Sequence, residues 1–247
     1  MSDGNGHFMV HRIPDTRLIG DRAGFIARAC ENRSVLHLGC AEWPTTAESL
    51  RDGTLLHLAV ASAARRALGV DLSEEGLAIL RASGFRDVVR WDVEKLSELE
   101  LDRPVDVIVA GEILEHLSNP GLCLAGAAQI MKRAGASLIL SVPNAFSLRH
   151  FLPLLLRRTE LVMPDHTAYY SITTLSELLG RYGLRIREIH MCMNGAGKSS
   201  RIVRSLKRVL TGTLFQLYPQ VSEGILVVAE NDSSDGRRAE MARRQPQ

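Results

Sequence analysis

The chain has 247 residues, 45% of them hydrophobic and 23% charged, and 30 basic residues against 28 acidic ones give a formal net charge of +2. This is ordinary globular composition, and the balanced charge excludes a protein that binds polyanions with its whole surface. Four widely spaced cysteines without a C-x-x-C pair favour reduced thiols over a disulfide framework. No run reaches the roughly 20 apolar residues of a membrane span, and residues 1–20 show no apolar leader pattern. We therefore expect a cytoplasmic protein.

Short apolar runs alternate with longer helical patterns along the chain, which predicts an α/β fold with a mostly parallel sheet. The predicted strands are 35–38, 67–70, 87–89, 105–110, 137–142, 184–190 and 224–229. The predicted helices are 47–66, 74–83, 94–99, 120–133 and 173–182.

The pattern is compatible with a single domain over residues 1–230. Two insertions interrupt the alternation, one at 146–163 with the run FLPLLLRR and one at 195–219 with several basic residues. Residues 231–247 are polar and poor in apolar side chains, so we expect a disordered tail.

Polar and glycine residues follow three successive predicted strands. Gly39 follows the first in VLHLGCAEWP, Asp71 ends the second in GVDLS, and Asp92 follows the third in RWDVEKL. A glycine lets the backbone approach a ligand closely, and an acid at the end of the second strand can accept both hydroxyls of a ribose. Asp92 stands where an acid can accept from an adenine amino group. Gly39 and Asp71 alone also fit a nicotinamide site, which the missing G-x-G-x-x-G disfavours.

With VDVIVAGEILEHL as the fourth strand and its loop, the chain from about Val35 to Glu230 resembles the class I S-adenosylmethionine-dependent methyltransferases. The resemblance implies a Rossmann-like, mostly parallel seven-stranded sheet with an antiparallel last strand. It also implies S-adenosylmethionine as the cofactor, with Gly111 close to the amino-acid portion. The other residues implied to bind this cofactor are Gly39, Asp71, Leu72, Asp92 and Val93.

The first motif departs from the family pattern. The family usually has an acid at the position of His37 and glycines at the positions of Ala41 and Trp43. The interval from Gly39 to Asp71 is also longer than is typical of the family. Two readings follow: a subfamily with a remodelled donor loop, or a protein whose donor binding has decayed.

Glu112, Glu115 and His116 recur at i, i+3 and i+4 within GEILEHL. On one helical turn this spacing places the three side chains on one face. Two carboxylates that converge with an imidazole repel one another unless a cation or proton joins them. The pattern therefore favours a divalent metal, and hard oxygen ligands favour Mg²⁺ or Mn²⁺.

A further histidine, His166, lies in PDHTAYYSITTL, ahead of the helix that begins near Thr173. The combination of E-x-x-E-H with a distant histidine resembles the ubiquinone-pathway O-methyltransferases and the small-RNA 3′-terminal 2′-O-methyltransferases. That resemblance implies Glu112, Glu115, His116 and His166 as the metal ligands and a metal-bound hydroxyl as the acceptor. Two alternatives stay open: His116 or His166 acts as a general base beside Glu115 without a metal, or these residues only line the pocket.

Three sequence features bear on the acceptor. The HLGC…EW turn, the NPGL segment and the ending PQVSEGILVVA resemble bacterial methyltransferases of glycan and glycolipid assembly, which implies a saccharide hydroxyl as acceptor, beside other small molecules. Residues 198–210 form a basic amphipathic pattern that can contact an anionic membrane or simply pack on the domain. With few aromatic residues and no stacking platform, a nucleic-acid acceptor is disfavoured. Asn144 in SVPN can contact the acceptor or belong to a turn.

The sequence thus supports three functions: a metal-dependent O-methyltransferase, a metal-independent methyltransferase with a histidine base, and a non-catalytic binding protein. It carries no signal for an oligomeric state.

Overall fold

One eight-stranded sheet runs through the protein, in the order β1-β7-β8-β6-β5-β2-β3-β4. We describe it from a computed structural model that covers residues 11–193 and 214–232. All neighbouring strands are parallel except β8, which lies antiparallel between β6 and β7. The strands are β1 (Arg17–Ile19), β2 (Ser34–Leu38), β3 (Arg66–Asp71), β4 (Val88–Arg90), β5 (Val107–Gly111), β6 (Ser137–Pro143), β7 (Leu184–Cys192) and β8 (Gly224–Asn231).

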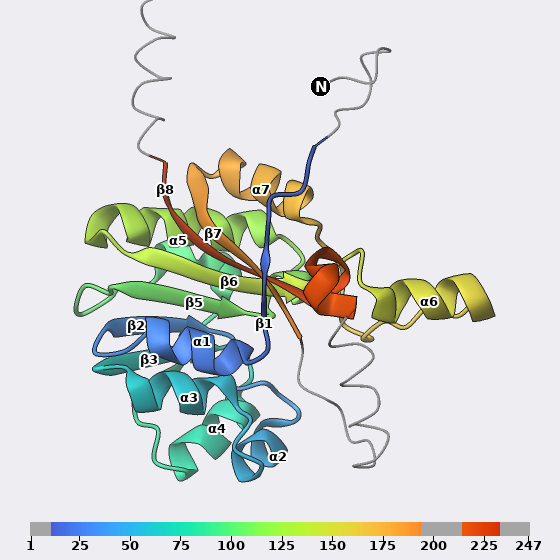
Figure 1. Ribbon diagram of the computed structural model, residues 1–247. Coiled ribbons are helices and arrows are strands. Elements are labelled where there is room, and N and C mark those ends of the chain that lie inside the picture. Colours follow the sequence, from blue (N-terminus) through green and yellow to red (C-terminus); the bar gives the residue numbers. More distant parts are fainter. Residues whose placement is uncertain (1–10, 194–213, 233–247) are drawn as a thin grey trace, which may run out of the picture.

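Helices cover both faces of the sheet (Figure 1). α5, α7 and the 3₁₀ helix η1 lie on one face, and α1, α3 and α4 lie on the other. The α-helices are α1 (Arg22–Ala29), α2 (Thr46–Arg51), α3 (Leu56–Ala63), α4 (Glu74–Ala82), α5 (Pro120–Ala134), α6 (Leu148–Arg157) and α7 (Ile172–Arg181). The 3₁₀ helices are η1 (Val93–Glu98), η2 (Leu114–His116) and η3 (Pro219–Val221).

Strand β2 shows why the central strands are continuous apolar runs in the sequence. Leu36 and Leu38 pack into the core beneath α5, while Val35 packs into the core beneath α1 and α3. Because successive side chains of a strand point to opposite faces, a strand covered on both faces buries every residue. All five residues of β2 are buried.

The predicted α/β class, the mostly parallel sheet and the antiparallel last strand are confirmed. The expected count of seven strands was one too low, because β1 adds an edge strand that pairs in parallel with β7. β1 has only three residues, and its mixed sequence gives no strand pattern. Helix α1 was also not predicted.

The single helix predicted over 47–66 was wrong. The structure has α2 and α3 there, and residues from Arg66 belong to β3. Gly53 adopts a positive φ of 68°, a conformation that ends a helix, and Thr54 N–H turns back to the carbonyl of Ser49 at 2.8 Å. The break redirects the chain so that α3 packs beside α1.

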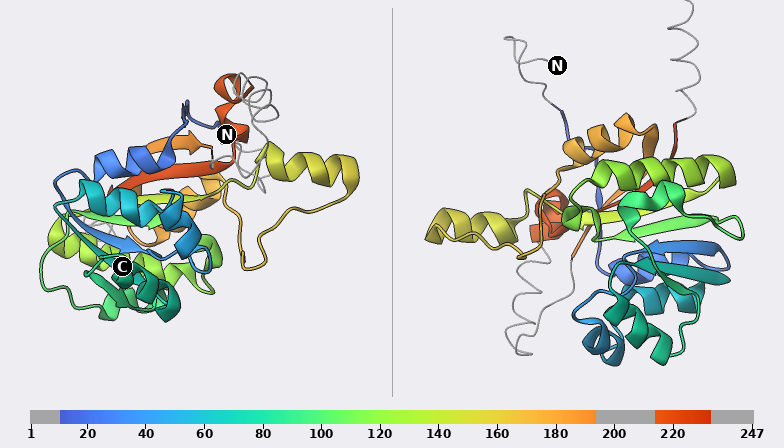
Figure 2. Two further views of the ribbon diagram at one scale, coloured as in Figure 1. Left: turned by 90° about the horizontal axis from the view of Figure 1, so that it is seen from below. Right: turned by 180° about the vertical axis from the view of Figure 1, so that it is seen from behind.

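The topology fixes where a ligand site can form. The strand order reverses between β2 and β5, and ligands of open α/β sheets bind beyond the carboxyl ends of the strands at such a point. Loops after β2, β3, β4, β5 and β6 all lie at this edge. The insertion after β6 forms α6, which projects from the body of the protein (Figures 1 and 2).

Most of the second predicted insertion, including 198–210, and most of the predicted tail lie outside the described residues. Among the residues that the structure describes, no helix is both long and apolar enough to cross a membrane.

Candidate active site

The turn after β2 brings the backbone of Gly39 against the loop that follows β5. Gly39 has a φ of 70°, and a Cβ at this position would lie 2.3 Å from Cδ1 of Ile113. Glycine is therefore needed here both for the backbone conformation and for the close approach. The predicted donor turn and the EILEH segment are in direct contact.

Asp71 holds the donor loop in place. Its carboxylate accepts hydrogen bonds from the backbone N–H of Ala41 at 2.8 Å and of Ser73 at 2.9 Å. A carboxylate has about four acceptor positions, so these two bonds leave acceptor capacity for the hydroxyls of a ribose. Asp71 thus has a structural role, and its contact with the donor stays a prediction.

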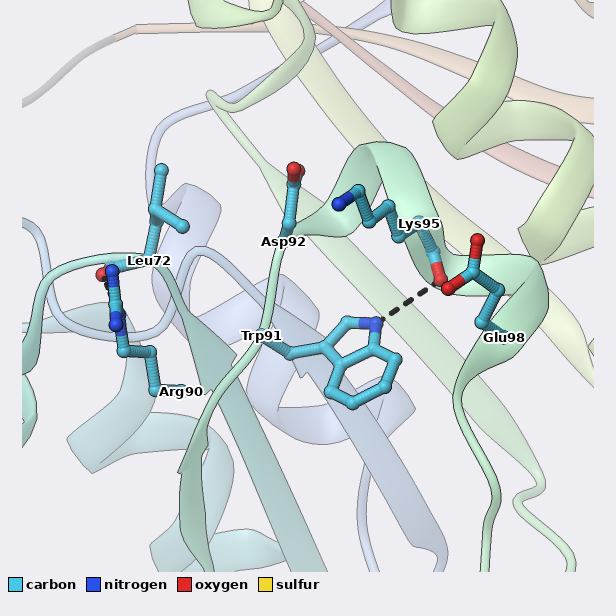
Figure 3. A pocket seen from close by; sticks show the side chains of 6 residues that line it. All are labelled: Leu72, Arg90, Trp91, Asp92, Lys95 and Glu98. Atoms are coloured by element: carbon cyan, nitrogen blue, oxygen red, sulfur yellow. Dashed lines mark hydrogen bonds between the residues drawn. The ribbon is translucent and has the colours of Figure 1, made fainter.

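A surface depression of about 220 Å³ lies beside Leu72 and Asp92 (Figure 3). The Asp92 carboxylate accepts from the N–H of Glu94 at 2.9 Å and caps η1, whose first residue, Val93, is buried. Leu72 and Asp92 extend in the same direction at this edge, whereas the ring of Trp91 points away. An apolar side chain beside a carboxylate suits the face and the amino edge of an adenine.

In the altered first motif, the side chain that replaces the expected acid pairs with a buried histidine. His37 takes the place of the expected acid, and its Nδ1 lies 3.0 Å from Nδ1 of His57 on α3. Both rings are buried, and this burial lowers the pKa of His57 to about 4 and that of His37 well below its usual value. Next to them, the Glu42 carboxylate accepts from the N–H of Leu56 at 3.0 Å. His37 and Glu42 therefore tie the donor turn to α3.

Arg22 is a site residue that the sequence analysis missed. From the first turn of α1 its Nη1 donates to Oγ of Ser141 at 2.8 Å and lies 3.3 Å from Oε1 of Glu112. It also lies near the position that a Cβ on Gly111 would occupy. A guanidinium here can attract the carboxylate of the donor's amino-acid portion. No sequence signal marks it, because 119 residues separate Arg22 from Ser141.

The structure brings three of the four predicted metal ligands together. Glu115, His116 and His166 each offer a ligand atom, and these atoms all lie within 4.8 Å of one another. The rings of His116 and His166 meet edge to face, with centroids 4.6 Å apart. The two segments are joined through Thr167, whose N–H donates to the carbonyl of Glu115 at 2.7 Å.

The side chain of Glu115 is fully buried, and neither carboxylate oxygen receives a hydrogen bond from another described residue. Burial, and then the nearby carboxylate of Glu112, raise the pKa of Glu115 to about 8. Burial, and then the neighbouring His116, lower the pKa of His166, whose Nδ1 is also buried without a hydrogen-bond partner in the described part of the chain. Buried polar atoms are nearly always bonded, so these atoms indicate a site for a ligand.

Asp165 was not predicted, although it precedes His166 directly. Its Oδ2 lies 2.9 Å from Nδ1 of His116. A carboxylate at this nitrogen holds the proton on Nδ1 and leaves the Nε2 lone pair available to a metal or a proton. Asp165 therefore orients His116.

Glu112 lines the same cavity but stands apart from the three-residue cluster. The expected helical turn over 112–116 is only partly formed, because Glu112 has a φ of 53° and the 3₁₀ helix η2 begins at Leu114. The Glu112 carboxylate faces Arg22 instead.

The cluster opens into a cavity of about 480 Å³ between η2, α6 and the segment after α6. Its walls are polar near Glu115 and apolar toward Leu161, Val162 and Met163. Asn144 does not line this cavity: its side-chain amide donates to the carbonyls of Gln220 and Ser222. Of its two predicted roles, the structure favours the turn.

Comparisons with known proteins show the family and the fold of the chain. Residues 11–189 match a family model described as a methyltransferase domain. A protein of Mycolicibacterium smegmatis named as an S-adenosylmethionine-dependent methyltransferase is 31% identical over 198 residues, which are 80% of this chain and 66% of that protein. A ubiquinone biosynthesis O-methyltransferase of Hahella chejuensis is 30% identical over 142 residues, 55% of this chain and 52% of that protein. The chain thus spans between half and two thirds of these relatives.

A methyltransferase structure from Archaeoglobus fulgidus shares the fold, with a TM-score of 0.50 and 16% identity over 85% of this chain and 92% of that one. The fold and the loops at its carboxyl edge define a class I, Rossmann-like methyltransferase. The chain belongs to the methyltransferase domain family that its sequence matches, and its methyl donor is S-adenosylmethionine.

Proposed function

We propose that this protein transfers the methyl group of S-adenosylmethionine to a hydroxyl oxygen, with Mg²⁺ or Mn²⁺ held by Glu115, His116 and His166. The observation that carries the proposal is the convergence of these three side chains in one cavity. A buried carboxylate without hydrogen-bond donors and two imidazoles fit a divalent cation, because the cation supplies the missing partner. Glu112, in the same cavity, stays a candidate fourth ligand.

The residues of this cluster and its neighbour Asp165 have different parts in the proposed chemistry. Asp165 fixes the ring of His116 so that Nε2 is free to bind. The lowered pKa of His166 keeps its ring neutral near pH 7, as a ligand or proton acceptor must be. A divalent ion held by these residues would lower the pKa of an acceptor hydroxyl and help to orient its oxygen. In the transfer, the acceptor oxygen would bond to the methyl carbon as the bond from that carbon to the donor sulfur breaks, and the hydroxyl proton would leave to a base or to solvent.

The acceptor that we propose is a hydroxyl of a saccharide or of another polyol-like small molecule. Carboxylate and imidazole groups line one side of the cavity, which suits an acceptor with several hydroxyls. The relative named as a ubiquinone biosynthesis O-methyltransferase supports oxygen as the acceptor atom. The sequence likeness to glycan-assembly enzymes supports a sugar.

A second candidate is metal-free transfer with a histidine base. The pairing of His116 with Asp165 favours it, because a carboxylate at Nδ1 holds the proton there and leaves the Nε2 lone pair to accept another. In that case Nε2 of His116 takes the acceptor proton as the methyl group arrives.

The deciding experiment measures donor consumption with a panel of sugars, glycolipids and catechols, each with Mg²⁺ and in metal-free buffer with EDTA. We expect turnover only with Mg²⁺ or Mn²⁺ and recovery of activity when the ion is restored. Full activity in EDTA would rule out the metal and favour the histidine base. Calorimetry with S-adenosylmethionine runs in parallel, since a protein that does not bind the donor is a non-catalytic member of the fold.

A further inference from the structure

Helix α6 exposes a large apolar surface outside the site described above. None of its ten residues is buried. The exposed apolar side chains of α6 and its flanks are Phe146, Phe151, Leu152, Leu154, Leu155, Leu156, Leu161, Val162 and Met163. Contiguous apolar patches on a folded protein mark sites of interaction. Figures 1 and 2 show that α6 projects away from the sheet and its covering helices.

The helix is amphipathic, and its Arg149 and His150 side chains contact Glu223 and Leu161 of the domain. At 100° per residue, Phe151, Leu152, Leu155 and Leu156 lie on one face, and Arg157 lies on the opposite face. Leu155 is 62% exposed and Leu156 is 73% exposed, so these leucines pack little on the described part of the domain. An apolar helix face that the described residues leave exposed can bind an external apolar phase.

The charges on this surface are mainly positive. Residues 146–163 contain three arginines and one glutamate. Arg157 and Arg158 stand exposed at the end of the helix, beside its most exposed leucine. Apolar side chains next to arginines are the pattern of helices that lie in the interface of an anionic membrane.

The exposed surface is continuous with the wall of the catalytic cavity. His150 of α6 binds the carbonyl of Leu161 through Nδ1 at 2.8 Å, which folds the segment after α6 back along the helix. Leu161, Val162 and Met163 are both exposed and part of the cavity lining. Whatever α6 contacts therefore also meets the entrance to the cavity.

We propose that α6 and residues 161–163 dock on the surface of an anionic lipid bilayer and hold the cavity entrance against it. A bilayer fits better than a protein groove, because exposed apolar side chains form a broad face that continues into residues 161–163, and arginines lie at the end of the helix. The proposal does not depend on the acceptor or on the metal, since membrane binding is measured without methyl transfer.

The test is sedimentation of the full-length protein with vesicles of phosphatidylcholine alone or mixed with phosphatidylglycerol. We expect binding to the anionic vesicles that weakens with salt. Leu155→Glu/Leu156→Glu should lower the partition coefficient roughly tenfold or more, because both apolar contacts are lost and negative charge is added. Arg157→Gln/Arg158→Gln should lower it several-fold, and only for anionic vesicles.

Matched controls separate α6 from general effects. Leu122→Glu changes a leucine that is 49% exposed on α5, and Arg103→Gln changes an arginine whose side chain is 74% exposed before β5. Both should bind vesicles as the wild type does. The melting temperature and the donor affinity should be unchanged in every variant, because no altered side chain is buried.

Three outcomes overturn the proposal. The first is no vesicle binding by the wild type. The second is equal binding by the α6 variants, which would place membrane contact elsewhere in the chain. The third is concentration-dependent self-association that the α6 variants abolish, without vesicle binding, which would make a second copy of the chain the partner.

Discussion

The donor half and the acceptor half of the candidate site differ in how their carboxylates are hydrogen-bonded. In the donor half, the carboxylates of Asp71 and Asp92 accept backbone N–H groups of their own loops. In the acceptor half, both carboxylate oxygens of Glu115 and Nδ1 of His166 are buried without a hydrogen-bond partner among the described residues. The donor half is therefore preorganised by the protein itself, whereas the acceptor half leaves buried polar atoms of Glu115 and His166 for a ligand to bond.

The largest test of this contrast is Glu115→Gln, which keeps the shape of the side chain but cannot become a carboxylate. We expect kcat/KM to fall by about a hundredfold or more, roughly 3 kcal/mol of transition-state stabilisation. The affinity for S-adenosylmethionine, measured by calorimetry, should stay within about twofold. Glu177→Gln, at an exposed position of α7, is the matched control. A loss of donor affinity equal to the loss of activity would show that Glu115 acts in binding the donor.

On the donor side, the His37–His57 pair should make stability depend on pH. The pKa of His57 is about 4 in the folded protein, against a usual 6.5, so the unfolded chain binds more protons between these values. Its contribution is fully present above about pH 6.5 and is lost as the pH falls toward 4, by about 3 kcal/mol. Urea unfolding at a series of pH values measures this loss.

His57→Gln keeps a hydrogen-bonding side chain beside His37 and removes one titrating group. Its free energy of unfolding should therefore fall less between pH 6.5 and 4 than that of the wild type. His11→Gln, at an exposed position, should follow the wild type. If the free energy of unfolding had the same pH dependence in all three proteins, the lowered pKa of His57 would be contradicted.

Asp165→Asn tests whether the acceptor half has an orienting partner as the donor half does. The amide no longer holds a charge-assisted bond to Nδ1 of His116, so Mn²⁺ affinity should fall roughly tenfold. Titration followed by electron paramagnetic resonance measures this affinity without turnover. Asp52→Asn, an exposed acid at the end of α2, is the control. Unchanged Mn²⁺ affinity would show that Asp165 does not orient His116 for metal binding.

The smallest effect that we expect comes from Gly39→Ala, where the two halves touch. The new Cβ requires a positive φ and must displace Cδ1 of Ile113. The backbone strain costs about 1 kcal/mol, and Ile113 can move its terminal methyl group. We expect a drop of that size in the free energy of unfolding, and weaker donor binding by a few-fold. Gly84→Ala, also at a positive φ but in open space, shows the effect of strain alone.

The sequence by itself determined the fold class, because strands buried on both faces must be apolar throughout and helices between them must show a helical period. It also predicted most polar residues of the candidate site, because residues that follow strand ends, such as Asp71 and Asp92, lie at the edge where ligands of open α/β sheets bind. The boundary between α2 and α3 was missed because the break at Gly53 lies within an otherwise helical pattern.

Tertiary structure alone decided which side chains converge. Arg22 and Ser141 meet across 119 residues, and the segment of Thr167 binds that of Glu115 across 52 residues. It also decided the exposure of the insertion FLPLLLRR, whose leucines stand exposed on α6. Local patterns record which face of an element is apolar, but only the packed chain determines whether another element covers that face.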